Sequence, residues 1–247
     1  MVTQGTSNVQ RNRILNAMSN SDLALLQPYL KPTALSFRQR LQTANRNIQS
    51  VYFPASGIVS VVAMCGAERR QTEVAIVGRE GMTGLPVVHG ADRSPCDVFI
   101  QVEGDGQCIS ADNLREVMDQ SVTLLRCFLR FAHVFAVQSS FSAVANAHGK
   151  LEERLARWLL MAQDRIEADE LVLTHEFLSL MLGVRRAGVT EALHHFERMG
   201  VLQTARGAVI VKDRDGLEEC ANGFYGIPEA EFERLFASPP YSPGCPS

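Results

Sequence analysis

The sequence predicts an α+β protein with an N-terminal β-roll and flanking helices, one long helix, and a C-terminal winged helix-turn-helix. Three observations predict this fold class. Short strand-like runs separated by glycines come first, a long helical pattern follows, and two short helices followed by a hairpin come last. A chain of 247 residues is long enough for two domains with separate cores. We place the segments at residues 11–119, 120–148, 149–220 and 221–247.

Composition and the N-terminus restrict the class of protein. Hydrophobic residues make up 46% of the chain and charged residues 21%, as in ordinary globular proteins. The N-terminus has no apolar signal-peptide core, and no apolar run is long enough to span a bilayer. We therefore expect a cytoplasmic protein without a membrane partner.

The cysteines form neither a CxxC pair nor a tight cluster with histidine. In a cytoplasmic chain this spacing predicts free thiols that mostly fill the core, with no metal site and no cofactor. The six residues are Cys65, Cys96, Cys108, Cys127, Cys220 and Cys245.

The first segment reads as two short helices followed by strands. Residues 11–30 carry two helical patterns, and Ser21 or Asp22 can cap the second. Glycines and Pro54 separate the strand-like runs that follow, as in a small barrel, sandwich or β-roll. These runs are 48–53, 58–64, 73–77, 98–102 and 107–109. Ser110 or Asp112 can cap a short helix that ends this segment.

A long helix is predicted from about residue 122 to 147. It is apolar on more than one side. One side can therefore cover the β-domain while another meets a partner helix. Alternatively, the whole helix can lie in one large core. An amphipathic helix over residues 151–166 comes next. Residues 221–247 are first acidic and then rich in proline, which predicts a partly disordered tail. We expect its last ten residues to be disordered.

Residues 174–211 carry the functional signal. Thr174 is a good N-cap for a first helix, and Gly183 supplies the turn to a second helix, which begins near Arg185. Gly200 ends that helix, and two short strands around Arg206 and a glycine form a hairpin.

The second helix of this motif has two distinct faces. Val189, Ala192, Leu193 and Phe196 share one arc and should pack on the first helix, and Ala187, Thr190, Glu191 and His194 share the opposite arc. Arginines at the helix start attract phosphate, and short side chains let the helix approach base edges. Residues 171–212 carry five Lys or Arg against three Asp or Glu, a small positive island in a chain of net charge −3.

From Leu151 to Leu217 the chain resembles the C-terminal domain of Crp/Fnr-type transcription regulators. The matching stretches are LEERLARWLLMAQDRI and LTHEFLSLMLGVRRAGVTEALHHFERMGVLQTARGAVIVKDRDGLE. The rest, from about residue 10, fits a β-roll like a cyclic-nucleotide-binding domain and a dimerisation helix. The resemblance implies a homodimer that binds double-stranded DNA at an inverted repeat, with RNA polymerase as a further partner.

Carried over by position, the resemblance also implies site residues. DNA contacts fall on Thr174, His175, Arg185, Arg186, Ala187, Gly188, Thr190, Glu191 and Arg206. The dimer seam falls on Leu125, Phe128, Ala132 and Phe135.

The effector pocket departs from the family pattern. Relatives that bind cyclic nucleotides hold the phosphate with a glycine and an Arg-Ser pair, and the ribose hydroxyl with a glutamate. Here Gly84 matches the glycine and Arg93-Ser94 matches the pair, but Leu85 replaces the glutamate. Leucine cannot accept the hydroxyl hydrogen bond, and an unpaired hydroxyl costs about 1–3 kcal/mol. We therefore expect no tight cyclic-nucleotide site, and the sequence names no other effector.

Two other classes of function compete with a DNA-binding regulator. One is a sensor or scaffold protein that uses its winged helix for protein contacts. The arginines at positions 185 and 186 argue against it, because a protein-binding helix would more often present an apolar anchor there. The other is an enzyme, and no nucleophile-elbow, HExxH or phosphate-loop pattern supports catalytic residues.

Overall fold

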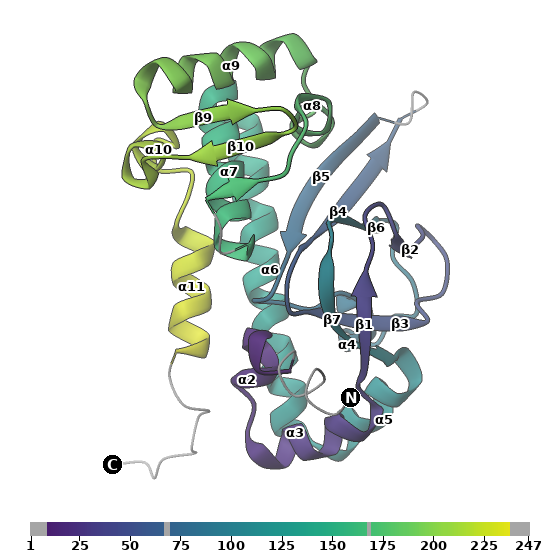
Figure 1. The fold of residues 1–247 in the computed structure, drawn as a ribbon. Helices are drawn as coiled ribbons and strands as arrows, with labels where there is room; N and C mark the ends of the chain where they lie inside the picture. The colour runs from purple at the N-terminus through teal and green to yellow at the C-terminus, as the bar shows by residue number, and fades with distance from the viewer. Residues whose placement is uncertain (1–8, 67–69, 167–168, 238–247) are drawn as a thin grey trace.

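The computed structural model describes residues 9–66, 70–166 and 169–237 and has the predicted α+β architecture (Figure 1). An N-terminal β-sheet domain lies at one end, and a smaller C-terminal domain lies at the other. A single long helix runs beside the first domain toward the second. This separation leaves the C-terminal hairpin and helices at the far end of the molecule.

Short helices precede the first strand. They are α2 (Arg13–Asn16), α3 (Asn20–Leu26) and the 3-10 helix η1 (Gln27–Tyr29). The cap of α3 is Ser19 rather than Ser21 or Asp22, because the Ser19 hydroxyl accepts the backbone N–H of Asp22 at 3.1 Å.

Two antiparallel sheets make up the β-domain. One has the strand order β1 (Lys31–Leu35), β7 (Gly104–Ser110), β3 (Ser50–Pro54), and the other has β2 (Arg40–Gln42), β6 (Asp97–Val102), β4 (Ile58–Cys65), β5 (Arg70–Val77). The five predicted runs are confirmed as strands, while β1 and β2 were not predicted. Val51, Phe53, Ile100 and Ile109 are at most 1% exposed and form the centre of the core.

Three of the helices that cover this core follow or lie between its strands. They are α4 (Leu85–Val88), α5 (Ala111–Gln120) and the long α6 (Val122–His148). Ser110 caps α5 by accepting the N–H of Asn113. The fully buried Phe128 of α6 packs its ring 5.9 Å from that of Phe53, centroid to centroid, so α6 is joined firmly to the sheets.

No apolar run long enough to span a bilayer was expected from the sequence, but helix α6 is long and apolar enough to cross a membrane by length and composition alone, with 33% of its most apolar 18-residue window buried. The core helix of a globular domain passes the same test. Its inner face packs on the β-domain, and its outer face is a separate surface described below.

The C-terminal domain contains α7 (Leu151–Ile166), β8 (Glu170–Leu171), α8 (His175–Leu182), α9 (Arg186–Met199), β9 (Leu202–Ala205), β10 (Ala208–Val211) and α10 (Arg214–Cys220). The two helices of the predicted helix-turn-helix and the hairpin after them are confirmed. Strand β8 and helix α10 were not predicted.

The predicted tail needs correction, because residues 227–236 form helix α11 (Ile227–Phe236). This helix returns along α6 to the β-domain (Figure 1). Phe232 is only 3% exposed and joins the N-terminal core, while Glu233 pairs with Arg13 at 2.6 Å. The last ten residues, expected to be disordered, lie outside the described residues.

The five cysteines in the described part are free thiols, as predicted. Their expected place in the core holds only in part: Cys127 and Cys220 are partly buried against the two cores, whereas Cys65 is exposed. Cys245 lies outside the described residues. Within the described ranges, no group of three or more His, Cys, Asp or Glu side chains could hold a metal ion.

Candidate nucleic-acid interface

Helices α8 and α9 are joined by a tight turn. The Thr174 hydroxyl accepts the N–H of Phe177 at 3.2 Å and caps α8, as predicted. Gly183 ends α8 with φ +65° and Gly200 ends α9 with φ +77°, a left-handed conformation that glycine adopts without strain. These turns fix where α9 begins and ends.

One face of α9 is buried and holds the helix in place. Val189, Ala192, Leu193 and Phe196 are at most 1% exposed and belong to the core of the C-terminal domain, as their spacing predicted. Burying four apolar side chains from one 14-residue helix fixes its rotation about its own axis. The opposite face therefore points outward in a defined orientation.

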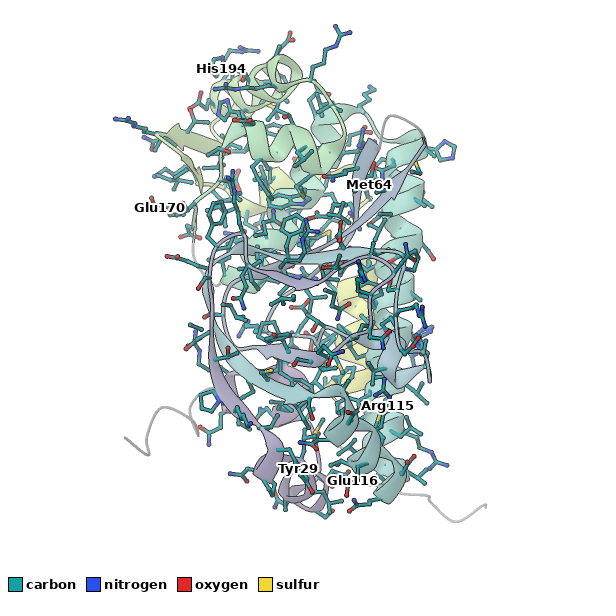
Figure 2. The ribbon with its side chains drawn as sticks, turned by 90° about the vertical axis from the view of Figure 1, so that its right-hand side faces the viewer. Tyr29, Met64, Arg115, Glu116, Glu170 and His194 are labelled. Atoms are coloured by element: carbon teal, nitrogen blue, oxygen red, sulfur yellow. The ribbon has the colours of Figure 1, made fainter. Side chains whose placement is uncertain are left out.

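The outward face of α9 forms an open hollow. Figure 2 shows His194 at the end of the molecule opposite Tyr29. The hollow is lined by Arg186, Ala187, Thr190, Glu191, His194 and Arg198. Arg198 was missed by the sequence analysis, although it continues the i, i+4 row of Arg186, Thr190 and His194.

A hydrogen bond joins the two helices at the edge of this hollow. His175 Nδ1 and Thr190 Oγ1 lie 2.9 Å apart, and the Thr190 hydroxyl lies 3.1 Å from the carbonyl of Arg186, to which it donates. Partial burial, and then the positive charge of Arg186 and the nearby His194, lower the pKa of His175. The neutral imidazole is therefore favoured, and His175 contributes by orienting Thr190.

The other predicted contacts occupy different environments. Arg185 is exposed immediately before α9, where it serves as the N-cap without a side-chain capping bond. Gly188 is partly buried and faces α7, because a Cβ there would lie 3.0 Å from the Leu151 side chain. Gly188 thus allows close helix packing and does not line the hollow.

The hairpin β9–β10 is attached to α9. Arg206 is exposed at its tip, beside Gly207, which has φ +76°. Glu197 of α9 accepts the backbone N–H and the hydroxyl of Thr204 at 2.7 and 2.5 Å, and these bonds lower its pKa. β8 adds a third strand to this sheet. Sequence patterns gave no sign of the Glu197 contact, which joins helix and hairpin into one unit.

The residues matched to the effector pocket lie in unlike surroundings. Gly84 begins α4 with φ +73°, and a Cβ there would lie 2.5 Å from the Val51 side chain. Leu85 is only 7% exposed and belongs to the apolar core. The Arg93 side chain is 58% exposed and pairs with Asp92 at 3.0 Å, while Ser94 accepts the N–H of Cys96. Leu85 therefore serves packing in this protomer.

The predicted dimer seam needs correction at two of its four positions. Phe128 is 0% and Ala132 7% exposed within one protomer, where both pack in the N-terminal core, so neither is available to a partner. Leu125 and Phe135 are half-buried against the same core. A row of exposed residues runs along α6, which we call the outer stripe: Val122, Arg126, Leu129, His133, Ala136, Ser140, Ala143 and Ala147. Thr123, Val144, Asn146 and His148 of α6 are exposed beside it.

Comparison with known proteins agrees with this geometry. A family model described as the Crp-like helix-turn-helix domain matches residues 153–220. No curated protein matches the chain.

Solved structures share the architecture over most of the chain. A structure assigned to the Crp/Fnr family of transcriptional regulators, from Eubacterium rectale, is 17% identical with a TM-score of 0.65, covering 85% of this chain and 98% of that one. FixK2 from Bradyrhizobium japonicum is 14% identical with a TM-score of 0.67, covering 77% and 96%. The global regulator CLP from Xanthomonas campestris, described as responsive to c-di-GMP, is 15% identical with a TM-score of 0.63, covering 78% and 99%. At such low identity, these likenesses establish the fold.

Proposed function

We propose that this chain, which has the Crp/Fnr regulator fold and a Crp-like helix-turn-helix domain, is a sequence-specific DNA-binding transcription regulator that works as a homodimer on an inverted repeat. The observation that carries the proposal is the outer face of α9. Two exposed arginines at its start adjoin a hollow of short and polar side chains at one end of the molecule. A helix with those properties suits the major groove.

The outer stripe of α6 supports the dimer. Its eight residues recur at alternating steps of four and three, the spacing at which two helices pair along a seam. Five of them are aliphatic, and Leu129 is 42% exposed. Because the inner face of α6 already packs on the β-domain, pairing of two outer stripes would bury apolar surface that one protomer leaves in water. This pairing would account for the apolar residues on the exposed side of α6.

Dimer symmetry leads to the inverted repeat. A two-fold axis along the outer stripes would relate the two α9 helices, and half-sites would lie about 34 Å apart, one turn of B-DNA. Bound in this way, the dimer would act on transcription through RNA polymerase at the promoter.

We propose that the effector is not a cyclic nucleotide. Leu85 contributes a buried side chain to the core, where related cyclic-nucleotide sites place a carboxylate. Arg93 points to Asp92, which would compete with a phosphate for the guanidinium.

Selection of bound DNA from a random pool tests the proposal. The wild-type protein should enrich an inverted repeat, and a variant with Arg185→Ala and Arg186→Ala should not. A matched variant that changes two residues of α5 away from α9, the partly buried Arg115→Ala and the exposed Glu116→Ala, should enrich the same repeat. Enrichment of no sequence by the wild-type protein, with and without cell extract as a source of effector, would contradict the proposal.

A further inference from the structure

The hairpin formed by β4 and β5 reaches from the β-domain to the C-terminal domain. Figure 1 shows it extending toward α8, and Figure 2 shows Met64 of β4 close to the helices of the C-terminal domain. Both α7 and α8 contact this hairpin. Polar side chains at this contact are unusual, because the surrounding residues are part of an apolar core.

The centre of this interdomain contact is the carboxylate of Glu73 on β5. Trp158 of α7 donates its indole N–H to Glu73 Oε1 at 2.6 Å, and the hydroxyl of Ser60 on β4 donates to Oε2. The Ser60 Oγ also lies 3.4 Å from the sulfur of Met181 on α8. Glu73 is only 9% exposed, and its hydrogen-bond donor Trp158 comes from the other domain. Separation of the domains would therefore return this carboxylate to water.

The charged groups around Glu73 belong to α7 and do not fully offset its burial. Arg157 and Arg165 attract the carboxylate, but their guanidinium groups donate to other acceptors. Arg157 donates to the Ser142 hydroxyl and the Phe224 carbonyl. Arg165 pairs with Glu80 and donates to the Met161 carbonyl. Arg154 lines a small cavity with Glu73 and donates to the Leu182 carbonyl.

The uncharged neighbours do not fully offset that burial either. Ser60 of β4 and Met181 of α8 carry no charge. Burial consequently dominates and raises the pKa of Glu73 to about 7, against the hydrogen bonds and the arginines, which lower it.

We propose that Glu73 is a proton-operated latch between the two domains, and that the protonated form holds the helix-turn-helix domain against the β4–β5 hairpin. A protonated carboxyl group can still accept the Trp158 N–H on one oxygen while it donates from the other to the Ser60 hydroxyl. The ionised form keeps the same neighbours but adds a buried negative charge, which is costly. The link to DNA affinity rests on the proposed function, whereas the latch itself does not.

The sign of the pH dependence follows from linkage. The pKa of Glu73 is raised in the closed contact and returns toward its ordinary value of 4.5 when the contact opens. The stabilisation of the closed contact is thus fully present below that ordinary value and is lost as pH rises through about 7. Between pH 8 and pH 6 the ratio of closed to open protomers should rise about tenfold, for one proton per protomer.

The chain offers a direct probe, because Trp158 is its single tryptophan. The full-length protein is titrated from pH 5.5 to 8.5 while tryptophan emission and its quenching by acrylamide are measured. We expect a transition with a midpoint near pH 7, with redder emission and stronger quenching on the alkaline side. The Glu73→Gln variant should stay in the acid-side state throughout, since a neutral amide can accept from Trp158 and donate to Ser60. A flat wild-type titration, or the same transition in Glu73→Gln, would overturn the latch.

DNA affinity measured over the same range tests the consequence. Wild-type affinity for the selected repeat should change with pH, and this change should be much smaller in Glu73→Gln, which keeps all the histidines of the DNA-binding domain. Equal pH dependence in both proteins would overturn the control of DNA binding by Glu73. If the wild-type protein binds no DNA at any pH but the emission transition is present, the proposed function fails and the latch stands.

Discussion

Replacement of Arg186 by alanine tests whether α9 reads base edges. Arg186 is the first residue of α9 and lines the open hollow with Ala187 and Glu191, so its side chain starts at the point where the helix would enter the major groove. Arg206, by contrast, is exposed at the tip of the hairpin, away from the hollow. We assign Arg186 to a guanine and Arg206 to phosphate.

The two assignments give different magnitudes. A bidentate arginine–guanine pair contributes about 1–3 kcal/mol of discrimination, so Arg186→Ala should lose roughly 5- to 150-fold in affinity on the preferred site and much less on a site with that base pair changed. Loss of a phosphate contact weakens all sequences alike and lowers the slope of log K against log salt by about one unit. Arg206→Ala should follow this second pattern, as should Arg185→Ala.

Fluorescence anisotropy on matched and mismatched duplexes at two salt concentrations separates these outcomes. If Arg186→Ala loses affinity uniformly on all sequences, as expected for Arg206→Ala, then Arg186 does not read a base. The helix-turn-helix assignment would survive that result. If Arg206→Ala instead relaxes the preference at one base pair, the roles of helix and hairpin are exchanged.

Three further results are expected. Leu129→Glu on the outer stripe should give monomers in light scattering, and dimers from this variant would refute the seam. Phe128→Ala should instead leave a dimer whose free energy of unfolding in denaturant is about 3–5 kcal/mol lower. Calorimetry with cyclic AMP or cyclic GMP should show no binding in the low-micromolar range, and such binding would mean that Leu85 is not decisive. Thr174→Ala should cost about 1 kcal/mol of stability through loss of the α8 cap, while an unchanged melting temperature would show that the capping bond is dispensable.

The local features of the fold could be predicted from the sequence because their signals are local. Gly183 and Gly200 mark the ends of two helices, and the i, i+3, i+4 spacing of Val189 and its neighbours fixes the buried face of α9. The assignment failed where one helix has two apolar sides. Along α6 the sequence pattern does not distinguish the side that meets the β-domain from the side left exposed. Phe128 was therefore placed on the seam although it packs against Phe53.

The features that could not be predicted depend on contacts between distant residues. Helix α11 is too short and too polar to have a clear signal of its own, and it is held by Phe232 in a core built from the other end of the chain. Glu73 and Trp158 are 85 positions apart, and neither residue carries a pattern that announces the other.

Their pairing has a physical consequence for how the two domains communicate. An apolar interdomain contact would respond weakly to solution conditions near neutrality, since apolar burial does not involve protons. A buried carboxylate at the same place makes closure of the domains depend on proton uptake, at the cost of some stability when the group is ionised. Leu85 occupies the position at which related cyclic-nucleotide sites have a glutamate. Protonation of Glu73 would therefore couple the β-domain to α8 and α9 without a bound nucleotide.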